Sequence, residues 1–463
     1  MLSEQKISNK KNHLLSWIIF LPTLIIVLFT LIFGMFPALQ IIFSDKLRFP
    51  VEINAFEPGV WMFPILISNT IIFATIILYR KNKLPQILTS LFRFILNFEI
   101  SYRIALVLVV VLIGSYAILT VGEVYTEEQW GDFIVVEEAL RNWSFDNVSI
   151  NFRMIPYFFG YLSMEIFGSY RVSPFIASII CLFLTYLITV QISKKRFAGI
   201  IALGIVLQSE NFLVYDTTAT YPGLWIMFYL LSIYFVFKSW SLSAISFTSA
   251  MLSHPLSVGF FPITILFIAL LDLPKRKKIL LFSSYFVLIV IGIVLLSTQI
   301  IPTPVGFTYD DTSPLDVSRI ISAFASILTQ FRYDGLIVVF LLPLVVCLFL
   351  ASKRGISNAN ALLVLIGGVM LLILFIPVLT SMGNTPYRIL PLVFFFAIGV
   401  GTLLSKNINL QDGLLTNSDL RDGSRKRNDE KNKKRSDEIE NSKHKSLSGL
   451  RRAKKRKKKF GRN

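Results

Sequence analysis

The sequence predicts an all-α integral membrane protein with about twelve transmembrane helices. Of its 463 residues, 54% are hydrophobic and only 16% are charged, which is too little charge to cover a soluble domain of this size. The charged residues lie in gaps between long apolar runs, and basic gaps alternate with acidic gaps along the chain. Basic loops are retained in the cytoplasm during insertion, so the alternation predicts a multi-pass protein of the cell membrane with both termini cytoplasmic.

Most of the apolar runs are long enough for a membrane span, which takes about 20 helical residues. These runs are 14–44, 59–79, 104–122, 172–193, 217–237, 279–309 and 335–352. The alternation of charge then assigns the remaining stretches, because 197–209 pairs with 217–237 and 355–380 pairs with 389–405. The run 239–271 lies between Lys238 and Lys275, which should both be cytoplasmic, and has Pro255 near its middle. This predicts two short crossings that meet outside at His254.

The same pattern divides the chain into three parts. Residues 1–103 are expected to form an N-terminal transmembrane hairpin and a cytoplasmic interfacial helix over 86–103. Residues 104–406 are expected to form the transmembrane core, with external loops 122–171, 209–220, 301–334 and 381–388. Residues 407–463 are polar, charged and nearly free of aromatic residues, so they predict a disordered basic cytoplasmic tail that binds anionic lipid headgroups.

Two further interfacial helices are expected on the outer surface. The charge-free stretch 154–164 is too short to span, so it predicts a helix lying under the acidic loop 122–171. In the loop 301–334, Ser313, Pro314 and Asp316 form a helix-start signature, and apolar residues recur at helical spacing up to Phe331.

The first external loop holds eight carboxylates, three arginines and a series of short motifs. The motifs are Trp130-Gly131-Asp132, Glu137-Glu138-Ala139-Leu140, Pro156-Tyr157, Ile166-Phe167-Gly168 and Arg171-Val172-Ser173-Pro174-Phe175. This series resembles the first outer loop of the GT-C polytopic glycosyltransferases, in the group of protein mannosyltransferases and aminoarabinose transferases that use polyprenyl-phosphate sugars. In that family an Asp begins the loop, and a Pro-rich segment leads to Phe-Gly before the next span.

Two later segments extend the resemblance over roughly residues 104 to 406. The sequence Tyr215-Asp216-Thr217 before Tyr221-Pro222-Gly223 is similar to the second outer loop of the family. The sequence from Met251 to Pro255, followed by Phe261-Pro262, resembles the family's Leu-Thr-Lys turn and Pro-containing span, with His254 in the place of the lysine. At the first site, Asp132 is followed by Phe133, where family members often have a second acid.

The resemblance implies a GT-C-like membrane glycosyltransferase that uses a polyprenyl-phosphate-linked sugar and a glycan, lipid or protein acceptor on the external face. Inverting transfer needs a carboxylate that deprotonates the acceptor hydroxyl, and Asp132 is the expected base. The leaving phosphate needs cationic stabilisation, for which Arg388 and His254 are the expected ligands. Glu128, Tyr215 and Asp216 are the other expected substrate-binding residues. The sequence does not resolve hexosyl from pentosyl transfer, and it leaves a divalent Mg²⁺ or Mn²⁺ open.

Each of these residues also has a structural interpretation. Asp132 is one acid among many in its loop, and the base could instead be Glu123, Glu127 or Glu128. Asp216 can cap the second loop, Arg388 can snorkel to lipid headgroups, and His254 can be a polar turn residue.

Two other functions share the topology. A twelve-span transporter would place its rare charges at the bilayer midplane, whereas these spans are nearly free of ionisable residues. A lipid-linked glycan polymerase or ligase would be expected to carry a large basic external loop, whereas this loop is acidic. Nucleic acid is not an expected partner.

Overall fold

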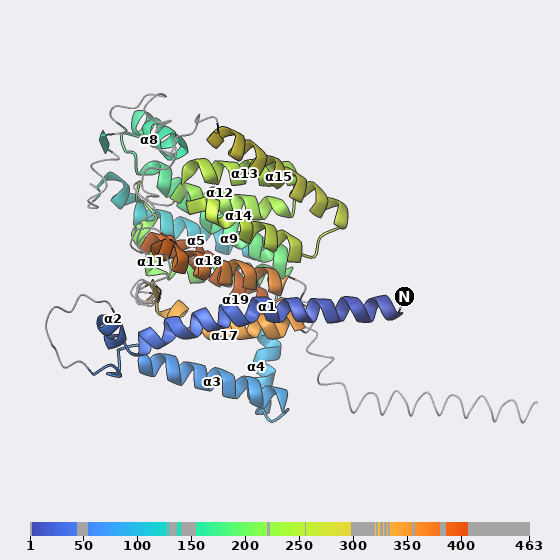
Figure 1. The fold of residues 1–463 in the computed structure, drawn as a ribbon. Helices are drawn as coiled ribbons and strands as arrows, with labels where there is room; N and C mark the ends of the chain where they lie inside the picture. The colour runs from blue at the N-terminus through green and yellow to red at the C-terminus, as the bar shows by residue number, and fades with distance from the viewer. Residues whose placement is uncertain are drawn as a thin grey trace, which may run out of the picture. The chain divides into compact units, whose positions relative to one another are not determined.

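The computed structural model describes residues 2–43, 54–126, 128, 137–138, 140, 154–219, 223–254, 256–297, 320, 323–324, 327, 331, 334–353, 356, 358–379 and 386–405. These residues form α-helices and short 3-10 helices with no strand, as the sequence predicts (Figure 1). Residues Met1–Ile408 belong to one compact unit. The expected disordered tail, 407–463, lies outside the described residues.

Along the chain, the helices are α1 (Leu2–Met35), α2 (Ala38–Phe43), α3 (Met62–Arg80), α4 (Gln86–Asn97), α5 (Tyr102–Thr120), η1 (Val121–Tyr125), α8 (Met154–Phe167), α9 (Val172–Ser193), α10 (Arg196–Leu207), α11 (Glu210–Tyr215), α12 (Gly223–Val236), α13 (Trp240–Ser253), α14 (Leu256–Leu270), α15 (Lys275–Ser297), α17 (Gly335–Lys353), α18 (Ala359–Leu379), η2 (Pro386–Ile389) and α19 (Leu390–Leu403).

Five segments of the described chain are long and apolar enough to cross a membrane. They are Leu15–Met35, Met62–Tyr79, Tyr102–Tyr125, Val172–Ser193 and Gly335–Lys353. Shorter apolar helices lie at Arg196–Leu207, Gly223–Val236, Leu256–Leu270, Ala359–Phe375 and Tyr387–Leu403. The chain therefore has the helices of a multi-pass membrane protein, and a helix occupies each of the apolar stretches that the sequence assigns to a span.

Some boundaries differ from the prediction. The stretch expected to be one interfacial helix over 86–103 is shorter, because α4 ends at Asn97 and Ser101 caps the start of α5 by accepting a hydrogen bond from the amide of Ile104. The second external loop contains the short helix α11, where Ser209 accepts a hydrogen bond from the amide of Phe212. The outer interfacial helix expected at 154–164 corresponds to α8.

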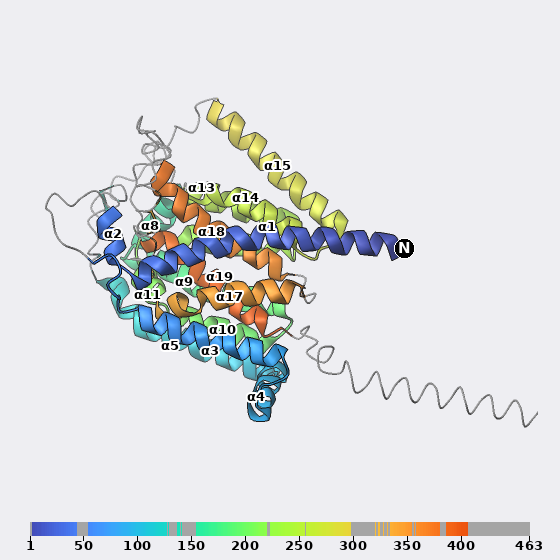
Figure 2. The ribbon, with the colours of Figure 1, turned by 60° about the horizontal axis from the view of Figure 1, so that its bottom comes forward.

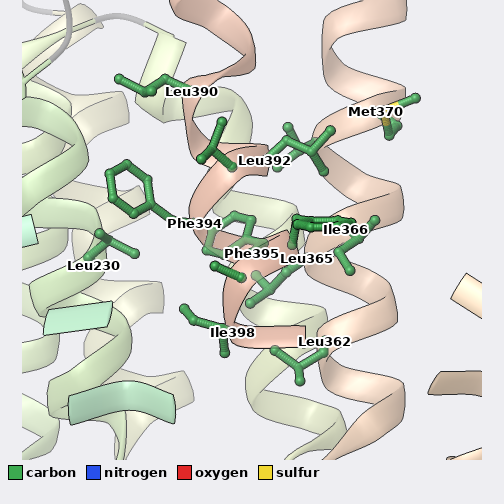
Figure 3. Close-up of a cluster of buried hydrophobic side chains, with 14 of the residues drawn as sticks. Leu230, Leu362, Leu365, Ile366, Met370, Leu390, Leu392, Phe394, Phe395 and Ile398 are labelled. Atoms are coloured by element: carbon green, nitrogen blue, oxygen red, sulfur yellow. The ribbon is translucent and has the colours of Figure 1, made fainter. Parts of the chain in front are cut away.

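The core is centred on α19. Its residues from Leu390 to Ile398 are all buried, because α9, α10, α17 and α18 pack around it. Figure 3 shows Phe394, Phe395 and Ile398 of α19 beside side chains of α18 and Leu230 of α12. By contrast, α3 and α5 turn many apolar side chains outward, which suits contact with lipid.

One glycine permits a close helix crossing in this core. A Cβ at Gly401 would clash with Cγ2 of Thr189 on α9 and would lie 2.9 Å from the carbonyl oxygen of Ala198 on α10. Glycine at this position therefore allows α19 to approach the backbone of α10.

Contacts join two acidic loops at one end of the helices, and they join a basic gap to the N-terminal part of α1 at the other end. At one end, Arg171 bonds Thr126 and Thr217, which belong to two different acidic loops. At the other end, the ammonium of Lys353 lies 4.2 Å from the ring centre of Trp17 near the N-terminus. Figures 1 and 2 accordingly show α2, α8 and α11 toward one end of the helices and the N-terminus at the other. We refer to these as the acidic end and the basic end.

Candidate functional site

The described residues at the acidic end include most of the expected site residues. Glu128, Tyr215, Asp216, His254 and Arg388 are described, whereas Asp132 lies outside the described residues. Among the alternative bases, Glu127 also lies outside them, and Glu123 is exposed on η1. Two groups of contacts connect the described residues.

The first group is a junction between the first and second external loops, and Arg171 is at its centre. Nη1 of Arg171 donates to the carbonyl oxygen of Thr126 at 2.9 Å and to its hydroxyl at 2.8 Å. Nε and Nη2 donate to the carbonyl oxygen and hydroxyl of Thr217 at 3.1 and 2.5 Å. Only a planar guanidinium can reach both threonines in this way, so Arg171 acts as a clamp between the loops. The sequence motif contained Arg171, but no pattern in it indicated this role.

Asp216 lies beside the clamp and is 1% exposed. Its Oδ2 accepts the hydroxyl of Tyr116 at 2.7 Å, and its backbone carbonyl accepts the hydroxyl of Ser178 at 2.7 Å. Its Oδ1 is buried and has no partner among the described residues. Burial raises the pKa of Asp216 to about 7, and the charge of Glu123 adds to this, while the Tyr116 hydrogen bond and Arg171 act in the opposite direction.

Glu128 extends the same junction. Its carboxylate is buried and accepts the backbone amide of Ala219 at 2.9 Å, so it also joins the first external loop to the second. Burial, with the charge of Glu128 as the next cause, raises the pKa of the neighbouring Tyr170 to about 12. The hydrogen bond from Ala219 therefore favours a structural role for Glu128, in which it anchors the first external loop to the second.

The second group is a row of rings drawn from separate segments. The ring centres of Tyr215 and Tyr387 are 6.3 Å apart, and those of Tyr387 and His254 are 6.2 Å apart. Trp225 follows at 6.0 Å from His254, and its buried indole nitrogen has no partner among the described residues. These residues come from α11, η2, the α13–α14 turn and α12, so the row exists only in the folded chain.

Two cationic or hydrogen-bonding groups adjoin this row. Nδ1 of His254 accepts the amide of Leu256 at 3.1 Å, so the neutral ring carries its proton on Nε2 and is a donor there. Arg388 follows Tyr387 in η2 and is only 7% exposed. An arginine that merely snorkels to headgroups keeps its guanidinium in water, so the burial of Arg388 argues against that interpretation.

Asp334 is a buried carboxylate that the sequence did not single out. It accepts the side-chain amide of Asn211 and, at 3.4 Å, the backbone amide of the same residue. Burial raises its pKa. Asp334 thereby ties the start of α17 to α11, and the only sequence signal was its position as the last acid before an apolar helix.

The described residues show no group of three His, Cys, Asp or Glu side chains that could hold a metal ion. Several carboxylates of the acidic loops, Asp132 among them, lie outside the described residues. The expectation of Mg²⁺ or Mn²⁺ therefore stays a prediction.

Comparisons with known proteins returned no matching family model, no matching curated protein and no matching solved structure. The resemblance to the GT-C glycosyltransferases therefore rests on the motifs and on their positions along this chain.

Proposed function

We propose that this chain is a GT-C-like glycosyltransferase of the cell membrane with twelve spans, both termini in the cytoplasm and its site on the external face. It would move a sugar from a polyprenyl-phosphate donor to an acceptor hydroxyl with inversion. The observation that carries the proposal is the row formed by Tyr215, Tyr387 and His254, with Arg388 next to it, at the acidic end.

The proposed chemistry uses these groups in one displacement. The base takes the proton from the acceptor hydroxyl, whose oxygen attacks the anomeric carbon as the bond to the phosphate oxygen breaks. The polyprenyl phosphate leaves with the bonding electron pair. The guanidinium of Arg388 and Nε2–H of His254 supply the positive charge and hydrogen bond that stabilise this leaving group. Asp132 is the proposed base.

The contacts of Glu128 and Asp216 favour a positioning role for both. Each is buried. Glu128 joins the first external loop to the second, and Asp216 joins the second loop to α5 and α9. In this proposal Glu128 positions the first loop by its bond to Ala219. Asp216 and the Arg171 clamp hold the second loop, which carries Tyr215 toward Tyr387.

The proposal is tested by transfer in nanodiscs with a panel of radiolabelled polyprenyl-phosphate hexoses and pentoses, scored by release of polyprenyl phosphate. Arg388→Ala should lower turnover about 10²–10³-fold, the usual effect of losing one group that stabilises a developing oxyanion. Arg196→Ala is the matched control, because Arg196 lies at the basic end beside Glu99 at 3.9 Å. Turnover equal in the two variants would contradict the assignment, and solute movement without cleavage of any donor would favour a transporter.

A further inference from the structure

Helix α4 carries polar and apolar residues on opposite faces. The polar residues recur at helical spacing, as do the apolar residues on the other side of the helix. The polar face holds Gln86, Ser90, Arg93 and Asn97, and the opposite, apolar face holds Leu88, Leu91, Phe92 and Ile95, with Ile87 and Phe94 at its edge. A helix of this pattern gains its stability from whatever covers its apolar face.

No residue of α4 is buried by the rest of the described chain. Ile87 is 83% exposed and Phe94 is 64% exposed, although both are large apolar residues. Leaving one large aromatic or aliphatic side chain in water forgoes about 1.5–3 kcal/mol of burial free energy. Several such side chains on one helix therefore indicate that lipid or another protein surface contacts it.

The attachment of α4 to the bundle explains why this face stays outward. The ammonium of Lys195 donates to the carbonyl oxygens of Ile95 and Leu96 at 3.2 and 2.6 Å, which caps the C-terminal end of α4. Just beyond that end, the rings of Phe98 and Phe197 are 4.9 Å apart. These contacts hold the end of the helix on the α9–α10 turn and leave its length uncovered.

The surroundings of α4 indicate what covers it. Figure 2 shows α4 running crosswise to α3 and α5, and it lies at the basic end, where α3 ends and α5 begins. Both neighbours contain spans with outward apolar side chains, so the apolar face of α4 continues a lipid-facing surface. Exposed Lys81, Lys83 and Arg93 add positive charge along the helix and its N-terminal turn.

We propose that α4 is an anionic-phospholipid-binding helix in the headgroup region of the leaflet at the basic end. Its apolar face enters the acyl chains, as in other amphipathic interfacial helices. Lys81, Lys83 and Arg93 bind the phosphates of anionic headgroups, where each basic residue contributes about a five-fold preference over neutral lipid. This surface is separate from the acidic-end site and does not depend on the proposed transfer reaction.

The test uses the full chain with Cys181 and Cys347 replaced by alanine and a single fluorophore on α4. A nitrobenzoxadiazole label at Leu88→Cys reports the apolar face, and the same label at Ser90→Cys reports the polar face. Nanodiscs contain brominated phosphatidylcholine or brominated phosphatidylglycerol. We expect lipid quenching and protection from iodide at position 88, and the reverse at position 90.

The charge preference is measured in the same nanodiscs. Arg93→Gln should lower the ratio of phosphatidylglycerol to phosphatidylcholine quenching at position 88 by up to about five-fold. Arg276→Gln is the control, because Arg276 is exposed in α15, which is remote from α4 in the chain. Access of iodide to position 88 would overturn the proposal. Protection from iodide without lipid quenching would also overturn it, because a protein would then cover α4, and equal quenching by both lipids would overturn the anionic preference.

Discussion

Asp216→Asn should change how the stability of the protein depends on pH. The carboxyl has an ordinary pKa of 3.8 and a pKa of about 7 in the folded protein. This difference corresponds to about 4 kcal/mol of unfolding free energy, which is present when the carboxyl is protonated and absent when it is ionised. Because burial disfavours the ionised form, the wild-type protein should lose this stability as the pH rises from about 4 to above 7. Asparagine does not ionise, so the variant should not lose it.

The variant also has a cost that does not depend on pH. Its side-chain oxygen can keep the hydrogen bond from Tyr116, but its amide NH₂ takes the place of Oδ1, which has no partner among the described residues. A buried donor without a partner costs about 1–3 kcal/mol. The variant should therefore be less stable than wild type at pH 4 and more stable at pH 8.

The assay is thermal unfolding in nanodiscs, followed by intrinsic fluorescence from pH 4 to pH 8, with the difference in Tm between variant and wild type as the readout. Asp272→Asn is the control for removal of a carboxylate, because Asp272 is exposed and lies at the basic end, away from the contacts of Asp216. Tyr116→Phe removes a hydrogen bond that lowers the pKa of Asp216, so it should move the loss of stability to higher pH. A flat difference for Asp216→Asn would refute the reasoning.

Three other changes test different parts of the molecule. Asp132→Asn should lower turnover in the transfer assay about 10²–10⁴-fold, while Glu123→Gln should leave it near wild type; the opposite pattern would move the base within the loop. Arg171→Lys loses the planar fork of the clamp, so limited proteolysis of the first external loop should accelerate, and unchanged cleavage would contradict the clamp. Gly401→Ala should lower stability by about 1–3 kcal/mol in thermal unfolding. Gly204→Ala, which has open space around it, should not, and equal effects would argue against close packing at Gly401.

The helices were largely predictable because their signal is local. Apolar length and the sign of the flanking charge are read within one segment, and a helix is found in each stretch that was expected to span the membrane. Most of the helix expected from Ser313 to Phe331 lies outside the described residues. The short helix α11 was not predicted, since six residues are too few to show apolar periodicity. Its start was readable, because Ser209 followed by Glu210 is a capping pattern.

The site was predictable only in part, because its contacts join distant segments. Tyr215, His254 and Arg388 were singled out from the sequence. Tyr387, whose ring lies between those of Tyr215 and His254 in the folded chain, was not. Asn211 and Asp334 are 123 positions apart, and no local pattern indicates such a pair. The same holds for the Arg171 clamp, whose two threonines lie on different loops.

The position of α19 bears on how the protein is made. It is the last of the described helices to leave the ribosome, yet it packs against α9, α10, α17 and α18 at the centre of the bundle. The helices synthesised before α19 must therefore either leave its position in the bundle unfilled, or pack together first and separate when α19 inserts. A chain stalled before residue 390 would present the inner faces of several helices to lipid and to chaperones, so assembly is completed from the inside and at the end of translation.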